Sequence, residues 1–388
     1  MNNDQSNPLG IDLDLVPCSP CFVVDEAQIL RNLAVLDQVQ QRTGCKILLA
    51  LKGFAMFSIF PLLNQTLHGA CASSLNEARL AREEFGREVH TFSPAYNEAD
   101  LKELLELSDH LIFNSFSQWQ RFRGLAMTKS ATVQFGIRVN PEHSETEVAL
   151  YDPCSPGSRL GVRRRNFRPD LLDGISGLHM HTLCEKNADA LARTLAVFED
   201  KFGEFVPRMK WINLGGGHHI TRKDYNVDLL CRVIMEFKQK YGVTVYLEPG
   251  EAIALNCGIL VTTVLDIIEN DLQTAILDTS AATHMPDVLE MPYRPEIPGA
   301  GLPGEKAYTY RLGGVSCLAG DVIGEYSFDH PLTIGDRLAF LDMAHYSMVK
   351  TTTFNGVNLP AIALRRHGNN HLDVIRRFGY EDYKNRLS

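Results

Sequence analysis

Short apolar runs alternate with amphipathic stretches along most of the chain. Eight such runs follow one another, at 46–51, 69–73, 88–92, 110–113, 133–139, 175–181, 210–214 and 243–248. Continuous apolar runs of this length are typical of parallel strands that are buried on both faces. The stretches between them carry helical spacing, as on the face formed by Ala188, Leu191, Ala192, Leu195 and Phe198. Eight strands alternating with helices predict an α/β fold, a (β/α)8 TIM-like barrel, although a doubly wound sheet uses the same alternation.

Beyond about residue 252 the pattern changes to short β-rich segments separated by glycine and proline, such as 306–312 and 337–342. We expect a C-terminal β domain with a sandwich-like or barrel-like sheet. The expected domains are a barrel at 27–252 and a β domain that combines 253–388 with 1–26, where the strand-like residues around Val23 pair into its sheet.

Two segments depart from the alternating pattern. Residues 141–174 form a loop rich in proline, glycine and arginine, and loops of this length are usually functional. The tail 371–388 is typical of a solvated helix or a frayed terminus.

Composition and charge narrow the class of protein. The chain has 388 residues, 45% hydrophobic and 22% charged, which is ordinary for a soluble globular protein. The net charge of −9, without a basic stripe, disfavours a nucleic-acid partner. The polar start Met1–Ser6 is unlike a signal peptide, and the longest apolar run, 258–268, is too short for a bilayer. We therefore expect no membrane partner, a cytoplasmic location and reduced thiols for the nine scattered cysteines, including the Cys18–Cys21 pair.

The polar residues that could carry chemistry fall at the ends of predicted barrel strands, where barrel enzymes build their sites. Lys52 closes the first run, just before Gly53. It is either a strand-end lysine that extends its ammonium into solvent or an amine poised to form a Schiff base. His179 and His181 end the sixth run and point to the same face, as metal ligation or ring stacking would require.

Two further candidates follow the last two runs. Gly215, Gly216 and Gly217 precede a helix, and three glycines in that position expose the backbone N–H groups that cradle a phosphate. Glu248 ends the eighth run, where its carboxylate could hold a proton on a heteroaromatic nitrogen. An amine, a ring-sized histidine, a phosphate cradle and an acid are the groups that pyridoxal 5′-phosphate (PLP) requires.

With these motifs the chain, from about Cys21 to Gly356, resembles the fold-type III PLP-dependent decarboxylases, which include ornithine, arginine and diaminopimelate decarboxylases. The resemblance implies a homodimer whose active sites are shared between subunits. The residues that match the family's functional positions are the Schiff-base Lys52, the ring-stacking His181, the phosphate loop Gly215–Gly217, the pyridine-nitrogen partner Glu248, the catalytic Cys317 in Gly313–Asp321, and the phosphate-contacting Tyr346.

Departures from the family pattern indicate a subfamily. Glu251 stands where related decarboxylases usually have arginine, and Leu318 follows Cys317 where an acid is usual. These differences, with the segments 283–292 and 350–356, are similar to carboxynorspermidine decarboxylase of polyamine biosynthesis. The expected reaction is decarboxylation of carboxynorspermidine, carboxyspermidine or both, to norspermidine or spermidine. The expected substrate-binding acids are Glu251, Asp287 and Asp321, unless some of them pair with Arg294 or Arg159 instead.

Other classes remain open on sequence alone. Another fold-type III decarboxylase, acting on diaminopimelate, ornithine or arginine, is the main alternative. A metal-dependent barrel hydrolase would use His179 and His181 with His218 and His219 as ligands, but it leaves the glycine loop and Glu248 without a role. A non-catalytic PLP-binding barrel and a racemase complete the alternatives. We expect no metal.

Overall fold

The computed structural model describes residues 8–369 and 371–388. The chain divides into two compact units, one formed by 32–253 and the other by 1–31 together with 254–388. Each unit is described by itself.

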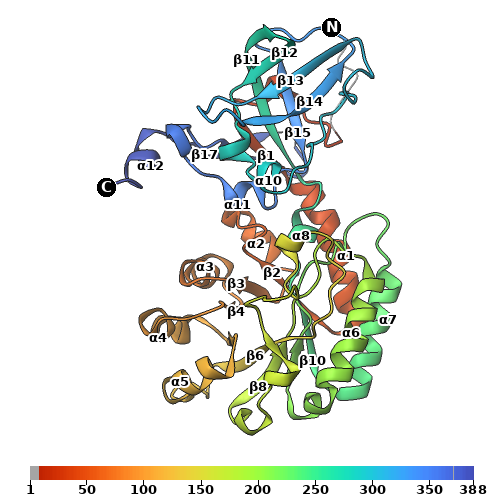
Figure 1. Cartoon of the computed structure of the whole chain (residues 1–388), viewed down its shortest axis with the longest axis vertical. Helices are drawn as coiled ribbons and strands as arrows, with labels where there is room; N and C mark the ends of the chain where they lie inside the picture. Colours follow the sequence, from red (N-terminus) through yellow and green to blue (C-terminus); the bar gives the residue numbers. More distant parts are fainter. Residues whose placement is uncertain (1–7, 370) are drawn as a thin grey trace. The chain divides into compact units, whose positions relative to one another are not determined.

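The first unit is a closed barrel of eight parallel strands (Figure 1). These strands are β2 (Lys46–Ala50), β3 (Gly69–Ala72), β4 (Glu88–Phe92), β5 (His110–Phe113), β6 (Gln134–Asn140), β8 (Ile175–His179), β9 (Trp211–Asn213) and β10 (Thr244–Leu247). Pairing of β5 with β6 and of β10 with β2 completes the ring. Every expected apolar run therefore became one strand, and the predicted (β/α)8 barrel is confirmed.

Helices connect the barrel strands. They are α1 (Glu26–Thr43), α2 (Phe60–Leu63), α3 (Leu75–Leu80), α4 (Glu98–Leu107), α5 (Phe116–Met127), α6 (Ala188–Phe202), α7 (Val227–Tyr241) and α8 (Glu251–Ala254), with a π-helical turn at Ala81–Phe85. Several begin at a Ser or Asn whose side chain accepts a backbone N–H of the first turn, as Ser74, Asn97, Ser115 and Asn226 do. Such caps satisfy N–H groups that would otherwise lack a partner and fix where each helix starts.

Trp211 fills part of the barrel interior. Its side chain is 1% exposed, and its ring lies against Gly136 and Gly177 on the neighbouring strands β6 and β8. A Cβ at either glycine would overlap the indole ring. The two glycines therefore leave the space that the Trp211 indole ring occupies inside the barrel.

The long segment 141–174 holds little regular structure. It contains the two-residue strand β7 (Val162–Arg163), which pairs with β6, and the 3₁₀ turns Ala149–Tyr151, Arg164–Asn166 and Pro169–Leu171. Other 3₁₀ turns in the chain are Leu13–Leu15, Phe57–Ile59, Gly203–Arg208 and Phe354–Gly356.

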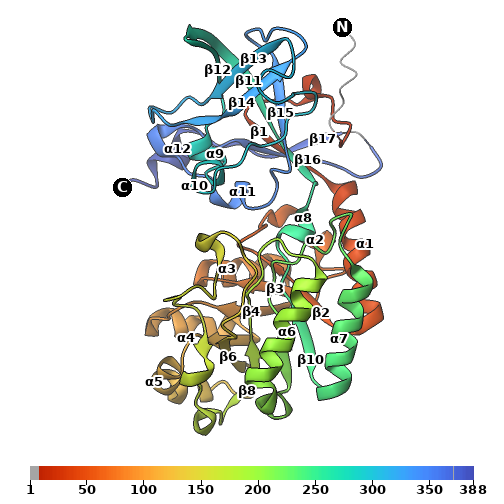
Figure 2. The same ribbon diagram turned by 45° about the vertical axis from the view of Figure 1, so that its right-hand side comes forward.

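The second unit is built on an eight-stranded sheet with the order β14-β13-β12-β11-β1-β16-β17, and β15 also pairs with β11 (Figure 2). Its strands are β1 (Cys21–Asp25), β11 (Gly258–Asn270), β12 (Leu272–Leu277), β13 (Tyr308–Gly313), β14 (Val322–Phe328), β15 (Arg337–Leu341), β16 (Ala361–Arg365) and β17 (Leu372–Arg376). The short helices are α9 (Ala281–His284), α10 (Asp287–Glu290), α11 (Ser347–Lys350) and α12 (Tyr380–Lys384). Strand β1, from the start of the chain, pairs antiparallel with β11 and parallel with β16.

The tail of the chain differs from its prediction. Residues 372–376 form the edge strand β17, which pairs antiparallel with β16, and only Tyr380–Lys384 is helical. The strand escapes sequence analysis because both of its faces are partly exposed and it carries charged residues, as edge strands often do. Among the described residues, none of the helices is long and apolar enough to cross a membrane.

Candidate active site

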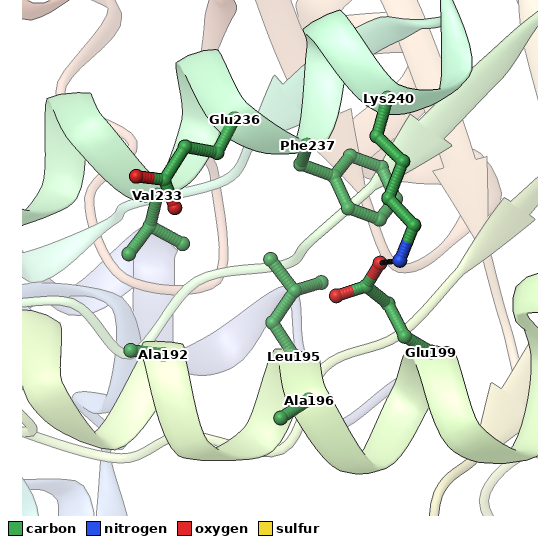
Figure 3. Close-up of a pocket in the computed structure, with 8 residues that line it drawn as sticks. All are labelled: Ala192, Leu195, Ala196, Glu199, Val233, Glu236, Phe237 and Lys240. Atoms are coloured by element: carbon green, nitrogen blue, oxygen red, sulfur yellow. Dashed lines mark hydrogen bonds and ion pairs between the residues drawn. The ribbon is translucent and has the colours of Figure 1, made fainter.

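A shallow pocket lies between helices α6 and α7, on the outside of the barrel (Figure 3). Leu195, Val233 and Phe237 line it, and an ion pair of 2.6 Å joins Lys240 to Glu199 at its edge. It holds none of the residues predicted to carry chemistry. The candidate site is instead at the carboxyl ends of the barrel strands.

The predicted barrel residues gather at one end of the barrel because parallel strands place all their carboxyl ends there. Lys52 follows β2, His181 follows β8, the glycine loop follows β9 and Glu248 follows β10. Direct contacts join them: Lys52 Nζ lies 3.3 Å from His181 Nε2, and the Gly216 N–H donates to His181 Nδ1 at 3.1 Å. The structure thus brings these four elements of the prediction together.

The contacts of His181 define the protonation state of Lys52. A neutral imidazole carries one N–H, and Nδ1 is already an acceptor, so Nε2 carries the proton and Lys52 offers its lone pair. Burial, and next the charge of Arg138, lowers the pKa of Lys52, although the side chain keeps contact with solvent. Burial and then Lys52 also hold the pKa of His181 well below its ordinary value. A lowered pKa favours the neutral amine, which is the nucleophilic form of lysine.

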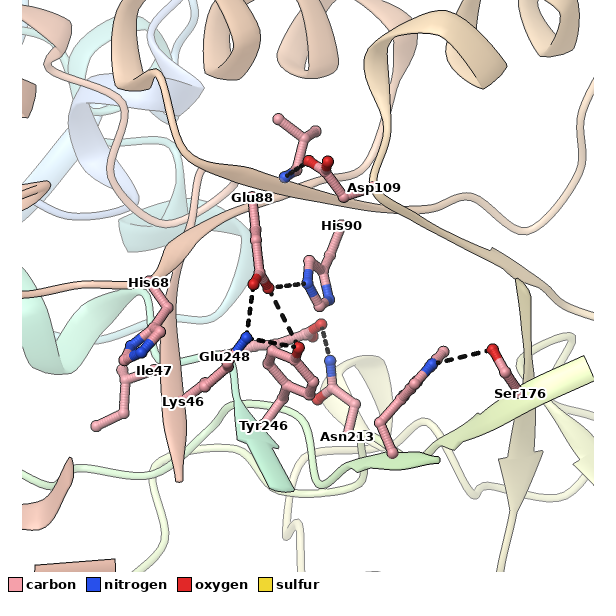
Figure 4. A network of polar contacts seen from close by, with 12 residues as sticks. Lys46, Ile47, His68, Glu88, His90, Asp109, Ser176, Asn213, Tyr246 and Glu248 are labelled. Atoms are coloured by element: carbon pink, nitrogen blue, oxygen red, sulfur yellow. Dashed lines mark hydrogen bonds and ion pairs between the residues drawn. The ribbon is translucent and has the colours of Figure 1, made fainter. Parts of the chain in front are cut away.

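Glu248 is an anion held in a fixed orientation. Its Oε1 accepts from Asn213 Nδ2 at 2.5 Å (Figure 4), and its Oε2 accepts from His179 Nε2 at 3.2 Å. Burial alone would raise the pKa of Glu248, but the interactions with His179 and His181 outweigh it and lower the pKa. Burial lowers the pKa of His179, which therefore acts as a neutral N–H donor. A carboxylate that stays ionised suits a protonated heteroaromatic nitrogen.

Two residues of this site were missed by sequence analysis. Arg138, on β6, is 4% exposed, donates to the His181 carbonyl at 3.0 Å and stacks over Phe92 with its guanidinium carbon 4.6 Å from the ring centre. Burial lowers the pKa of Arg138 to about 10, so it remains a cation at neutral pH. Asn213, the last residue of β9, orients Glu248 and also accepts the Gly215 N–H at 2.8 Å. In the sequence, the signal for both Arg138 and Asn213 is a polar residue within an otherwise apolar run.

The glycine loop requires residues without side chains. Gly215 and Gly217 have φ angles of +75° and +79°, which disfavour any side chain. A Cβ at Gly216 would overlap the Glu248 carbonyl, and one at Gly217 would overlap the Leu183 carbonyl. The N–H groups of Gly215 and Gly216 already donate to Asn213 and His181. In the described part of the chain the N–H of Gly217 has no such partner, so it is the part of the loop best placed to bind an anion.

The remaining predicted residues belong to the second unit. Cys317 is exposed on the loop between β13 and β14. Tyr346 has φ of +52° and ψ of −49°, a strained conformation of the kind that concentrates at functional sites. Asp321, predicted as a substrate-binding acid, is 4% exposed, and its carboxylate accepts hydrogen bonds from Ala281, Ala282 and Ser316. Its carboxylate is occupied within its own unit.

The other two predicted substrate acids have partners different from those considered. Glu251 Oε2 lies 2.8 Å from His219 Nε2. Asp287 and Glu290 both contact the Lys350 ammonium, at 2.7 Å for Glu290.

A second polar cluster lies near the first residues of β2, β4 and β5 (Figure 4). Glu88 Oε1 lies 2.6 Å from Lys46 Nζ, Glu88 Oε2 lies 3.2 Å from His90 Nε2, and the rings of His90 and His110 stack 3.9 Å apart at 10°. Glu88, His90 and His110 each bring a ligand atom within 4.8 Å of the others. Stacked imidazole rings direct their nitrogen lone pairs in parallel rather than toward one point, and the Glu88 carboxylate is already paired with Lys46. The cluster therefore serves as a network of polar and charged contacts within the barrel.

The histidines required by a metal-dependent hydrolase have other partners. His179 contacts Glu248, His181 contacts Lys52 and Gly216, His218 Nδ1 lies 3.4 Å from the Tyr225 hydroxyl, and His219 contacts Glu251. The four histidine side chains therefore each contact different residues.

The strand ends of this barrel bring together a lysine amine, a fixed carboxylate and a glycine loop without side chains, and the chain also holds a separate β unit. These features define the class of barrel-fold PLP enzymes. The residues fit the cofactor. Lys52 offers the amine that its aldehyde requires, Glu248 the anion for its ring nitrogen, and the loop at Gly217 a backbone N–H for its phosphate.

The comparisons with known proteins agree with this class. The family model described as "Pyridoxal-dependent decarboxylase, C-terminal sheet domain" matches residues 21–344. The chain is 51% identical over 372 residues to carboxyaminopropylagmatine decarboxylase of Synechocystis sp., covering 95% of each. It is 45% identical over 376 residues to carboxynorspermidine/carboxyspermidine decarboxylase of Campylobacter jejuni, covering 94% of this chain and 97% of the relative.

A solved structure has the same architecture. The crystal structure of carboxynorspermidine decarboxylase from Campylobacter jejuni, complexed with norspermidine, matches with a TM-score of 0.88 and 44% identity, covering 95% of this chain and 99% of that one. The chain belongs to the pyridoxal-dependent decarboxylase family. It is a PLP-dependent carboxy-lyase, and the resemblance, the cofactor and the enzyme class expected from the sequence are confirmed.

Proposed function

We propose that the protein removes the α-carboxylate of a carboxylated polyamine, with carboxynorspermidine and carboxyspermidine as the first candidates. The observation that carries this proposal is the similarity, over nearly the whole chain, to the Campylobacter jejuni enzyme whose crystal structure holds norspermidine. Decarboxylation of these candidates would yield norspermidine and spermidine, which places the reaction in polyamine biosynthesis.

The barrel residues hold and tune the cofactor. PLP supplies an electron sink for the pair of electrons that remains on the substrate Cα when CO₂ leaves. Lys52, whose pKa is lowered by burial and by Arg138, would hold the cofactor through its amine. Glu248, oriented by His179 and Asn213, keeps a proton on the ring nitrogen. His181 packs against the ring, and the glycine loop and Tyr346 bind the phosphate.

Cys317 acts as the acid that protonates Cα after CO₂ has left. We propose a homodimer in which Cys317 of one subunit serves the Lys52 site of the other, as the family resemblance implies. Mixing the inactive variants Lys52→Ala and Cys317→Ala should restore part of the activity, because hybrid dimers would carry one intact site. No recovery after verified subunit exchange would overturn the shared site.

The distal amines of the substrate need anionic partners, because each loses water on entering the site. Glu251 is the first choice, since it lies three residues after Glu248, at the start of α8, and its carboxylate contacts His219. Asp287 is the second choice, and it shares the Lys350 ammonium with Glu290. Asp321 is the weakest of the three, since its oxygens already accept hydrogen bonds.

Carboxyaminopropylagmatine is a second candidate substrate, favoured by the 51% identity to the Synechocystis relative that is named for it. It shares the carboxyaminopropyl group with the first candidates and differs at the far end, where a planar guanidinium replaces an ammonium. The two cations prefer different carboxylate geometries, since a guanidinium pairs in a bidentate fashion and an ammonium as a point charge. Both kinds of substrate present the same carboxyaminopropyl group to the reacting residues of the site.

A CO₂-release assay decides among these substrates. Carboxynorspermidine, carboxyspermidine, carboxyaminopropylagmatine, ornithine, arginine and diaminopimelate would be compared by kcat/KM on one preparation. Preference for a carboxylated triamine supports the first candidates, and preference for carboxyaminopropylagmatine supports the second. Preference for ornithine, arginine or diaminopimelate overturns the proposal. The two triamines differ by one methylene and should differ by only about 1–3 kcal/mol in transition-state binding.

A further inference from the structure

The loop that carries Cys317 has no regular structure of its own. It joins β13 to β14, and its residues from Cys317 to Gly320 are exposed. Exposed loops sample many conformations on the nanosecond to microsecond scale. An acid that must deliver a proton to one carbon atom has to be held within about 0.5 Å of its productive position. Contacts that restrain this loop therefore affect how precisely the Cys317 thiol is positioned for proton transfer.

Asp321 restrains the base of the loop. Its Oδ1 accepts the N–H groups of Ala281 and Ala282 at 2.7 and 3.3 Å, and its Oδ2 accepts the Ser316 N–H and hydroxyl at 3.1 and 2.6 Å. The carboxylate is buried, so these bonds face little competition from water. Through Asp321 the residue just before Cys317 is tied to the start of helix α9.

Asn355 restrains Cys317 itself. Its side-chain Oδ1 accepts the Cys317 backbone N–H at 2.7 Å. The backbone of Asn355 is left-handed, with φ of +56° and ψ of 13°, a region that asparagine tolerates better than other residues with a side chain. Position 355 therefore requires both a left-handed backbone and a side-chain hydrogen-bond acceptor, and few residue types supply both.

The segment that carries Asn355 is anchored on both sides by the same helix α9. The Thr352 N–H donates to the Thr283 carbonyl at 2.8 Å, and His284 Nε2 lies 3.0 Å from the Asn358 carbonyl. His284 Nδ1 accepts the Ser280 N–H at 3.2 Å, so Nε2 carries the proton and is the donor. Helix α9 therefore holds the Asn355 segment and, through Asp321, the base of the Cys317 loop.

We propose that Asn355 is a positioning residue, which fixes the Cys317 loop so that the thiol delivers its proton to the substrate Cα. The inference rests on the role of Cys317 given above. The electron pair left by CO₂ takes the thiol proton at Cα, and the product is the amine. If the proton instead reaches the aldehyde-derived carbon of the cofactor, the amino group stays there. Substrate and PLP then give CO₂, an aldehyde and pyridoxamine 5′-phosphate, and the enzyme is left without its cofactor.

Three variants separate positioning from general stability. Asn355→Gly removes the acceptor and keeps the left-handed backbone free of strain, while Asn355→Asp keeps both. Asn256→Gly is the matched control, because Asn256 is also an exposed asparagine with positive φ, at +55°, in the same unit. Cys317→Ala gives the reference for a lost proton donor. Two quantities are measured: the fraction of turnovers that end in pyridoxamine 5′-phosphate, and hydrogen exchange of the Cys317 amide in the cofactor-free protein.

Asn355→Gly should speed exchange of the Cys317 amide about tenfold, as expected for one lost hydrogen bond, and raise the abortive fraction about tenfold toward that of Cys317→Ala. Asn355→Asp and Asn256→Gly should match the wild type in both measurements. An abortive fraction in Asn355→Gly equal to that of Asn256→Gly would overturn the inference, whether or not exchange changes. If Cys317→Ala itself does not raise that fraction, the proposed role of Cys317 fails, and the positioning role fails with it.

Discussion

Replacing Glu248 with glutamine removes one negative charge and keeps the shape of the side chain. In the native protein the two carboxylate oxygens accept from Asn213 and His179. A glutamine side chain keeps one oxygen acceptor for one of these two donors, and its NH₂ group faces the other donor. His179 can adjust, because its buried Nδ1 has no hydrogen-bond partner among the described residues and can take the proton from Nε2. The free energy of unfolding should therefore fall by no more than about 1 kcal/mol.

The effect on catalysis should be much larger. Loss of a preorganised charge that faces the reacting system typically costs about 10²- to 10³-fold in kcat, or about 2.7–4 kcal/mol. The assay is CO₂ release by enzyme with verified cofactor content, combined with urea unfolding of the cofactor-free protein. Glu88→Gln is the matched control, because Glu88 is a carboxylate of the same barrel, at the start of β4, that contacts Lys46 and His90, and its replacement should leave kcat unchanged. A Glu248→Gln enzyme with kcat within threefold of the wild type would refute the role of the carboxylate.

Three further predictions address the loop, the amine and the stability of the protein. Gly216→Ala should abolish PLP binding, because the new Cβ overlaps the Glu248 carbonyl; normal cofactor absorbance would contradict this. Arg138→Met should raise the pKa of Lys52 and move the pH profile of cofactor attachment to higher pH; an unchanged profile would show that Arg138 does not act on the amine. Burial lowers the pKa of His284 from 6.5 to about 4, so the unfolded state takes up the proton first and acid favours unfolding. Stability should fall by about 2 kcal/mol between pH 7 and pH 5 through this group, and His284→Gln should remove that part of the fall in urea unfolding.

The barrel could be predicted from the sequence because each of its strands is buried on both faces. That environment selects continuous apolar runs, and the residue that ends each run projects at the mouth of the barrel. Lys52, His181 and Glu248 were found in this way. Arg138 and Asn213 were missed because they lie within runs, where a single polar residue does not interrupt the apolar pattern.

The partners of acidic residues could not be predicted, because they come from distant parts of the chain. Glu251 meets His219, and Asp287 meets Lys350, 63 residues away in the sequence. Asp321 stands near Cys317 in the sequence, which suggested contact with substrate. In the fold its carboxylate accepts hydrogen bonds from backbone N–H groups, contacts that leave no pattern in the sequence.

The most direct test of the account is the identity of the lysine that carries the cofactor. The holoenzyme would be reduced with borohydride, digested and mapped by peptide mass spectrometry, with Lys46→Arg as a control for the lysine at the start of strand β2. The account predicts that the pyridoxyl group is found on Lys52, that it is unaffected in Lys46→Arg and that it is absent from Lys52→Ala. Attachment to another lysine in the wild-type protein would contradict the assignment of the active site.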